Sequence, residues 1–206
     1  AIGAVNTVVN KNGLLCGYNT DYLGFAYLAD AHGVDFAGKT VLILGTGGTH
    51  NTTSAVAKDK GAAKVLTVSR NPDPAKGELS YAEAVHSGAQ IVINTTPAGM
   101  YPNVGICNLD VAAMPGLEAV LDVVYNPDKT ELILRAEEAK VPVAVGGLEM
   151  LVAQAVYAAE CFLDRKFDDD PGEIRTITAA LRREQLNVAL IGMPSSGKTT
   201  IGRALA

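Results

Sequence analysis

The chain has 206 residues, 48% of them hydrophobic, so a sizeable core and one or two domains are expected. A formal net charge of −5 and the lack of a basic run argue against a nucleic-acid partner, and no apolar run reaches the length of a membrane span. The three cysteines are widely spaced and odd in number, which favours a reducing, cytoplasmic setting over disulfides or a zinc site. The three histidines show no metal-ligand spacing, and the oligomeric state stays open.

The first stretch of the chain predicts structure rather than chemistry. Residues 1–9 form a small-residue turn followed by a strand. A helix is expected to start near Asp21, with Asn19 or Thr20 as its cap. By residue chemistry alone, Asp21 is most simply a carboxylate that complements the helix dipole, and Asn6 is a turn residue.

A buried strand, a glycine-rich turn, a helix and a second strand follow one another over residues 41–70. The strand VLILG is a short continuous apolar run, as expected for a parallel strand covered on both faces. Gly45, Gly47 and Gly48 let the backbone turn tightly, and the free N–H groups at the start of the next helix would bind an anion. The pattern is typical of the phosphate-binding half of a dinucleotide fold. It predicts an α/β, Rossmann-type, doubly wound parallel sheet.

The glycine pattern departs from the usual G-x-G-x-x-G/A at its last position, where His50 stands. The alternative to a phosphate site is an ordinary α/β turn that binds nothing. The second strand ends in Ser69, Arg70 and Asn71, without the acidic residue that commonly binds the ribose of NAD. Arg70 is suited to pair with a 2′-phosphate, which predicts NADP over NAD; the alternative is a solvated charge at a strand end.

More strands follow in the second half of the chain. IVIN, at 91–94, predicts a third parallel strand, and its loop at 95–100 falls at the carboxyl edge, where ligands sit in open α/β sheets. Residues 121–124 and 142–145 predict two further short strands.

Two helices accompany these strands. Asp128 or Thr130 is expected to start the first. The second covers residues 148–163, with Gln154 as a polar residue in its middle. Its apolar stripe is expected to pack in the core and consists of Leu148, Leu151, Val152, Ala155, Ala159 and Phe162.

Five motifs, in order along residues 1–167, resemble those of the shikimate dehydrogenase family. They are GAVNT (3–7), GYNTDYLGF (17–25), IVINTTPAGM (91–100), LDVVYNPDKTELILRAEEA (121–139) and GGLEMLVAQA (146–155). The resemblance implies NADP-dependent, reversible reduction of 3-dehydroshikimate to shikimate, a step of chorismate and aromatic amino acid biosynthesis.

The resemblance also assigns roles to the matching positions. Asn6, Asp21 and Gln154 would hydrogen-bond the hydroxyls of shikimate, and Tyr125 would lie beside the substrate. A wrong substrate leaves buried polar groups of such a site unpaired. The cost of those unpaired groups discriminates strongly between the right substrate and the wrong one. The cofactor positions would be Gly45, Thr46, Gly47, Gly48 and Thr49 at the pyrophosphate, Ser69, Arg70 and Asn71 at the ribose phosphate, and Val123 and Gly147 at the nicotinamide.

The family protonates the ketone oxygen with a Lys beside the Asp that Asp21 matches, because a carboxylate orients such a Lys and adjusts its proton affinity. That Lys belongs to a segment before GAVNT, so we expect it to be absent from this sequence, along with the residues for the shikimate carboxylate. Lys11 lies in a turn after the first motif and does not match it. The sequence begins without Met and ends within an expected helix, so both ends look cut. We expect the chain alone to be close to inactive.

The end of the chain carries a second nucleotide-binding pattern. Gly192, Gly197, Lys198 and Thr199 fit G-x-x-x-x-G-K-[ST] after an apolar strand. In such a loop, backbone N–H groups cradle the phosphates of ATP, the Lys reaches the outer phosphates and the Thr binds Mg²⁺. The stretch resembles the start of shikimate kinase and suggests a fused dehydrogenase–kinase. It lacks a second metal ligand, a base-binding segment and an acceptor site, so no kinase activity is expected.

We expect a remnant of a substrate-binding domain (1–30), an NADP-binding Rossmann domain (31–146), a helix that returns to the substrate domain (147–167), a linker (168–186) with a short charged helix from Glu173, and a truncated kinase start (187–206). Three other functions stay open. One is a quinate or quinate/shikimate dehydrogenase with NAD as its cofactor. Another is a P-loop transferase whose upstream domain only binds nucleotide, and the last is a structural α/β domain.

Overall fold

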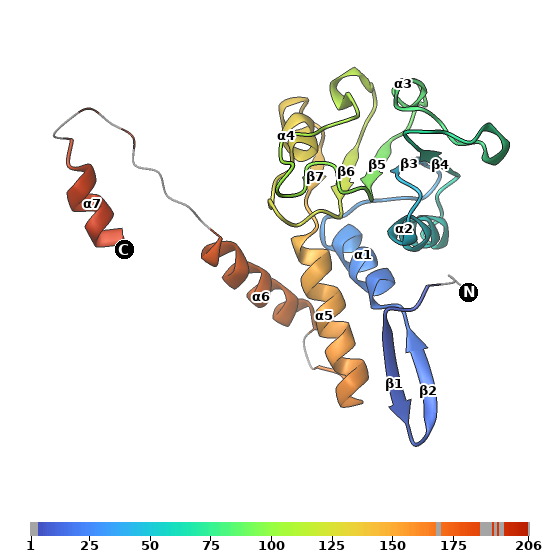
Figure 1. Cartoon of the computed structure of the whole chain (residues 1–206), viewed down its shortest axis with the longest axis horizontal. Helices are drawn as coiled ribbons and strands as arrows, with labels where there is room; N and C mark the ends of the chain where they lie inside the picture. The colour runs from blue at the N-terminus through green and yellow to red at the C-terminus, as the bar shows by residue number, and fades with distance from the viewer. Residues whose placement is uncertain (1–3, 168–169, 186–190, 192, 194–195, 206) are drawn as a thin grey trace.

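The computed structural model describes residues 4–167, 170–185, 191, 193 and 196–205. A hairpin opens the chain, and a parallel sheet with helices on both faces follows (Figure 1). The strands are β1 (Thr7–Lys11), β2 (Leu14–Tyr18), β3 (Thr40–Leu44), β4 (Lys64–Val68), β5 (Ile91–Asn94), β6 (Ala119–Asp122) and β7 (Val143–Val145). The helices are α1 (Thr20–Ala31), α2 (Gly48–Asp59), α3 (Tyr81–Ala84), α4 (Glu131–Glu138), α5 (Leu148–Leu163), α6 (Asp170–Glu184) and α7 (Lys198–Leu205), with 3-10 turns at Pro74–Lys76 and Val111–Ala113.

The five-stranded sheet has the order β4-β3-β5-β6-β7, and every pair in it is parallel. Its register places Leu44 beside Val68 and Asn94, and Asn94 beside Asp122. The carboxyl ends of β4, β3, β5 and β6 therefore meet at one edge. This confirms the expected Rossmann-type sheet and brings distant polar residues together.

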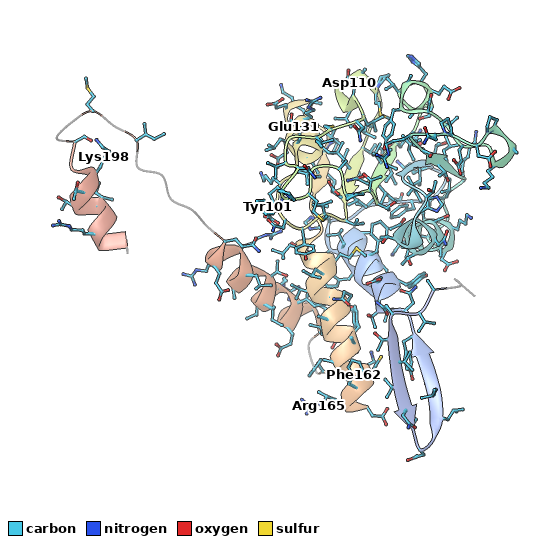
Figure 2. The ribbon with its side chains drawn as sticks, in the orientation of Figure 1. Tyr101, Asp110, Glu131, Phe162, Arg165 and Lys198 are labelled. Carbon is cyan, nitrogen blue, oxygen red and sulfur yellow. The ribbon has the colours of Figure 1, made fainter. Side chains whose placement is uncertain are left out.

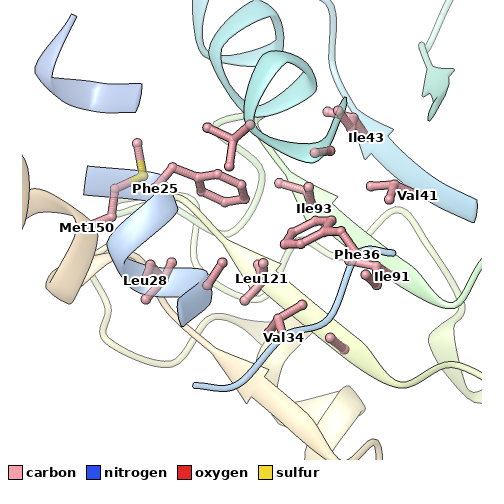
Figure 3. Close-up of a cluster of buried hydrophobic side chains, with 14 residues drawn as sticks. Phe25, Leu28, Val34, Phe36, Val41, Ile43, Ile91, Ile93, Leu121 and Met150 are labelled. Atoms are coloured by element: carbon pink, nitrogen blue, oxygen red, sulfur yellow. The ribbon is translucent and has the colours of Figure 1, made fainter. Parts of the chain in front are cut away.

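The core lies on both faces of the sheet because successive side chains of a strand point to opposite sides. Val41 and Ile43 of β3 pack with Phe25 of α1 on one face, and Figure 3 shows this cluster. Leu42 and Leu44 pack on the other face, with residues of α4. Each fully buried aliphatic side chain of this kind contributes about 1.5–3 kcal/mol.

Helices α1 and α5 cross at close range because Gly24 of α1 has no side chain. A Cβ at that position would lie 2.7 Å from the carbonyl oxygen of Met150 in α5. Helix α1 begins as expected, since the Asn19 side chain accepts a hydrogen bond from the N–H of Tyr22 at 3.0 Å. Helix α4 is capped by Thr130, one of the two expected starters.

One expected strand boundary and part of an expected buried stripe are wrong. Strand β6 covers Ala119–Asp122 rather than 121–124, because the chain leaves the sheet after Asp122. In α5 the apolar stripe is buried at Leu148 and Val152 but not at Phe162, which is 62% exposed. Figure 2 shows Phe162 at the end of α5 that extends past the sheet, where no core covers it.

Ala155 of the same stripe is also exposed, and Leu151 and Ala159 are half-buried. Strand β2 was not expected, because Leu14 and Leu15 give no alternating pattern; both are exposed in the hairpin. Nothing in the described chain forms a helix that is long and apolar enough to cross a membrane.

The segment expected to be a linker contains a packed helix. Helix α6 starts at Asp170, earlier than the expected Glu173. Its Ile174 is fully buried against Val152 and Val156 of α5. The apolar residue at Ile174 gives this charged helix a face to bury, so it is part of the packed body. Figure 1 draws α7 apart from that body.

Candidate functional site

The glycine-rich turn follows β3 and requires glycine for two reasons at Gly45. Its φ is +105°, a conformation that L side chains rarely adopt, and a Cβ would lie 2.9 Å from Thr96 Cγ2. Gly47 then precedes α2 and makes no side-chain cap. A Cβ at Gly47 or Gly48 would meet no atom of the described chain within 4 Å, so the space above the first turn of α2 is open. An open helix start with uncapped N–H groups suits a phosphate.

His50, which departs from the usual glycine pattern, does not fill that space. Its Nε2 lies 2.8 Å from the hydroxyl of Thr67 in β4, so the ring points toward the strand. A large side chain is accommodated at this position because the neighbouring strand offers it a hydrogen-bond partner. The departure from the usual motif therefore leaves the turn intact.

An exposed turn follows the carboxyl end of β4, and hydrogen bonds between neighbouring residues hold it. The Ser69 hydroxyl accepts a hydrogen bond from the N–H of Asn71 at 3.3 Å, and the backbone N–H of Ser69 donates to Leu79 at 3.0 Å. Arg70 is exposed. Burial raises the pKa of the Tyr81 phenol, while a hydrogen bond with Asn108 and the charge of Arg70 oppose the shift. The charge of Arg70 therefore lies close enough to Tyr81 of α3 to act on its phenol.

A buried hydrogen-bond network joins the ends of β5 and β6. Asp122 accepts from Asn94 Nδ2 at 2.9 Å, from the N–H of Val124 at 3.0 Å and from the Thr130 hydroxyl at 2.7 Å. Asn94 in turn accepts from the N–H and hydroxyl of Thr96, at 3.1 and 2.7 Å. Burial raises the pKa of Asp122 to about 6, against the opposing effect of its three hydrogen bonds.

The network gives a structural role to the part of the 121–139 motif that begins at Asp122 and ends at Thr130. The first residue accepts the hydroxyl hydrogen of the last, so the loop between them is closed at its base. Sequence reasoning assigned Thr130 only a possible capping role, and it assigned none to Asn94 or Asp122. The signal was present in the polar residues that end two adjacent buried strands.

Val123 and Gly147, the two expected nicotinamide positions, lie against each other. A Cβ at Gly147 would be 2.2 Å from the carbonyl oxygen of Val123, and the N–H of Gly147 donates to Val124 at 2.8 Å. Gly146 is equally close to the backbone of Asp128, where a Cβ would be 2.2 Å from the carbonyl oxygen. Only glycines permit the loop after β6 to pack on the start of α5. Tyr125, at the outer part of that loop, is 43% exposed.

Three of the four expected substrate residues, Asn6, Asp21 and Gln154, lie at or near the start of α1. Asn6 accepts from the N–H of Thr20 at 2.8 Å and donates to its hydroxyl at 3.0 Å. The same hydroxyl lies 3.5 Å from Gln154 Oε1 of α5. Asp21 follows in the first turn of α1 and is half-buried. The structure thus brings Asn6 and Gln154 to one hydroxyl, that of Thr20, which sequence reasoning treated only as a possible cap.

Gly197, Lys198 and Thr199, the described residues of the P-loop pattern, take no part in the site contacts above. Gly192 lies outside the described residues, and Gly197 and Thr199 lie at the start of α7. Lys198, labelled in Figure 2, donates to the carbonyl oxygen of Met193 at 2.7 Å, so it turns back into its own loop.

No family model matches the chain. A shikimate dehydrogenase (NADP(+)) from Clostridium perfringens is 35% identical over 182 residues, which cover 84% of this chain and 67% of the relative. The chain belongs to the shikimate dehydrogenase family. It spans about two thirds of the relative's length.

Solved structures of the shikimate dehydrogenase family also resemble this chain. A chorismate mutase/shikimate 5-dehydrogenase fusion protein from Clostridium acetobutylicum gives a TM-score of 0.82 at 31% identity, covering 89% of this chain and 68% of the other. Shikimate 5-dehydrogenase from Thermus thermophilus, solved with NADP(H) and shikimate, gives 0.73 at 27% identity, covering 87% and 69%. Nothing in these comparisons shows a shikimate kinase segment or a fusion with one.

Proposed function

We propose that this chain supplies the NADP(H) site and part of the substrate site of a shikimate dehydrogenase, which interconverts 3-dehydroshikimate and shikimate. The observation that carries the proposal is that the open glycine-rich turn and the Val123–Gly147 contact both lie at the carboxyl edge of the sheet. Membership of a family whose relatives are NADP(+)-dependent shikimate dehydrogenases supports it.

The proposed cofactor roles follow from the turns at the carboxyl edge of the sheet. The turn from Gly45 to Thr49 would hold the pyrophosphate, and the turn from Ser69 to Asn71 would hold the 2′-phosphate of the adenosine ribose. Val123 and Gly147 would flank the nicotinamide. NADP(H) supplies the hydride, while the chain binds it and orients its two ends.

The substrate roles rest on the polar group at the start of α1. Asn6, Asp21 and Gln154 would bind the hydroxyls of shikimate, and exposed Tyr125 would lie along the substrate. Thr20 holds Asn6 in place, since it bonds both the oxygen and the nitrogen of that amide. A substrate that lacks one of these hydroxyls would leave one of these polar side chains without its partner in the closed complex, which disfavours its binding.

The proton for the ketone oxygen needs a donor that we do not find among the matching positions. Lys11 is unsuited, because it pairs with Asp164 at 2.5 Å near the tip of the hairpin. We therefore propose that Asp21 orients a Lys outside this sequence, and that the chain alone turns over shikimate very slowly. Robust shikimate-dependent reduction of NADP by this polypeptide would contradict that proposal.

The division into a substrate remnant (1–30), a Rossmann domain (31–146), a returning helix (147–167), a connecting segment (168–186) and a truncated kinase start (187–206) remains part of the proposal. We assign ATP and Mg²⁺ binding only to a complete kinase, with Lys198 and Thr199 in the roles that the pattern gives them. Incubation of the chain with ATP, Mg²⁺ and shikimate should give no phosphorylated product.

A fluorescence titration with NADPH and NADH tests the cofactor proposal directly. We expect NADPH to bind more tightly than NADH, because Arg70 is placed to meet the additional phosphate. If neither nucleotide binds a chain that melts cooperatively, the proposed site is wrong. Turnover of shikimate and of quinate by this chain, supplemented with the missing segment, would then separate a shikimate dehydrogenase from a quinate dehydrogenase.

A further inference from the structure

The guanidinium group of Arg182 in α6 contacts the loop after β6. Arg182 Nε lies 3.3 Å from Asp128 Oδ2, and its Nη1 lies 3.2 Å from Glu149 Oε1. Asp128 is in the loop that carries Val123 and Tyr125, and Glu149 is in the first turn of α5. The side chain of Arg182 therefore joins the two segments that the nicotinamide would contact.

Glu149 extends this contact to α1. Its second oxygen, Oε2, lies 2.9 Å from His32 Nε2, at the C-terminal end of α1. The hydrogen bond with His32 and the charges of His32 and Arg182 hold the pKa of Glu149 below its usual value, although partial burial opposes them. The side chain of Glu149 is 16% exposed and that of Arg182 is 43% exposed, so solvent screens the carboxylate less than the guanidinium group.

The loop after β6 has a fixed base and an outer part that Arg182 holds. Its base is fixed by Asp122, and its middle packs on Gly146 and Gly147. The carbonyl oxygen of Asn126 also accepts from the N–H of Tyr101 at 3.0 Å. Beyond that point, the described side-chain contacts from other helices include Asp128 with Arg182 of α6 and Lys129 with Glu137 of α4, the latter at 2.7 Å. The contact with Arg182 is the one that also reaches α5, through Glu149.

We propose that Arg182 is a positioning residue for the nicotinamide half of the cofactor site. It holds the loop after β6 against the start of α5, so that Val123 and Gly147 stay in contact and together form the surface that the nicotinamide ring would meet. The inference rests on the proposed function, and it assigns to α6 a part in cofactor binding although α6 touches no proposed cofactor position.

The test compares Arg182→Gln with Arg183→Gln, which removes the same charge from an exposed neighbour. Each variant is titrated with NADPH and with adenosine 2′,5′-bisphosphate, which has no nicotinamide. Arg182→Gln should weaken NADPH binding about three- to tenfold and leave the bisphosphate unchanged, whereas Arg183→Gln should change neither. Arg182→Lys should recover part of the loss, because an ammonium group keeps the charge but not the two-sided geometry.

Hydrogen exchange of the ligand-free proteins provides a second readout. Arg182→Gln should accelerate amide exchange in residues 123–129 and at Gly147, and Arg183→Gln should not. Equal weakening of both ligands would show a general structural role and overturn the inference, as would unchanged NADPH binding with unchanged exchange. Failure of the unaltered chain to bind NADPH would overturn the proposed function instead, and the exchange comparison would still decide whether Arg182 holds the loop.

Discussion

The two ends of the proposed cofactor site are built in different ways. At the nicotinamide end, Asp122 is fully buried and is fixed by Asn94 and Thr130, which are far from one another in sequence. At the adenosine end, Arg70 is exposed, and the turn depends on local bonds of Ser69. Buried networks cost stability when they are broken, whereas exposed groups adapt to a ligand. We therefore expect changes at the first end to lower the free energy of unfolding and changes at the second to alter affinity alone.

The largest effect is expected for Gly147→Ala. The new Cβ would lie 2.2 Å from the carbonyl oxygen of Val123, and backbone cannot move aside cheaply. Because such overpacking forces the loop and α5 apart, the free energy of unfolding should fall by about 3 kcal/mol. Denaturant unfolding measures it.

The matched control is Gly48→Ala in the glycine-rich turn. A Cβ there meets no described atom within 4 Å, so the free energy of unfolding should change by less than about 0.5 kcal/mol. NADPH binding should nevertheless weaken, because the methyl group would occupy the space above the helix start. Equal destabilisation by the two alanines would contradict the contrast between the two ends.

The next effect is the pH dependence caused by Asp122. Its pKa in the folded protein is about 6, above the ordinary 3.8, so the folded state binds this proton more readily than the unfolded state. The stabilisation is therefore complete below about pH 4 and is lost as the pH rises through about 6. The shift of about two pH units corresponds to a loss on the order of 2–3 kcal/mol.

Asp122→Asn is the control for that pH dependence. The amide keeps nearly the same shape but does not titrate, so the free energy of unfolding of the variant should change less between pH 4 and 7 than that of the unaltered chain. Urea unfolding at several pH values measures how the free energy of unfolding of each protein depends on pH. Parallel curves for the two proteins would assign the pH dependence to other carboxyl groups.

A smaller loss of stability is expected for Thr130→Val. The substitution removes the hydroxyl that donates to Asp122 and that caps α4 at the N–H of Ile133. One carboxylate oxygen of Asp122 is then buried without its donor, which costs about 2 kcal/mol. Thr130→Ser keeps the hydroxyl and should retain most of the stability. A melting curve distinguishes the two, and equal melting temperatures would show that the hydroxyl contributes nothing.

The elements that sequence predicts well are those with a complete local signal. Helix α5 has the expected bounds, and Asn19 caps α1 as expected, because apolar periodicity and a capping side chain are properties of adjacent residues. The strand, glycine-rich turn and helix around Gly45 were likewise predictable. These local signals are sufficient to identify the fold class, and they predict which edge of the sheet would bind a phosphate.

What the sequence does not predict depends on which segments become neighbours. The pairing of Asn94 with Asp122 requires β5 and β6 to lie side by side in register. The orientation of His50 depends on the hydroxyl of Thr67 in the adjacent strand. The contact of Arg182 with Glu149 depends on how α6 packs on α5. No periodicity or motif along the chain encodes these partners.

The smallest effect on stability, and the most selective effect on binding, is expected for Arg70→Ala. Arg70 is exposed at the end of β4, so its loss should leave the melting temperature unchanged. A charge-assisted contact with the 2′-phosphate would be lost, and NADPH should bind about tenfold more weakly while NADH binding stays the same. Lys76→Ala is the matched control. Lys76 is an exposed residue further along the same loop, where it pairs with Asp73. Its replacement removes the same charge and should alter neither the affinity for NADPH nor that for NADH. If NADPH and NADH weaken together in Arg70→Ala, the residue serves the nucleotide in general and does not select the phosphate. Loss of NADPH preference in Lys76→Ala instead would move the phosphate contact away from the end of β4, to the 3-10 turn that contains Lys76.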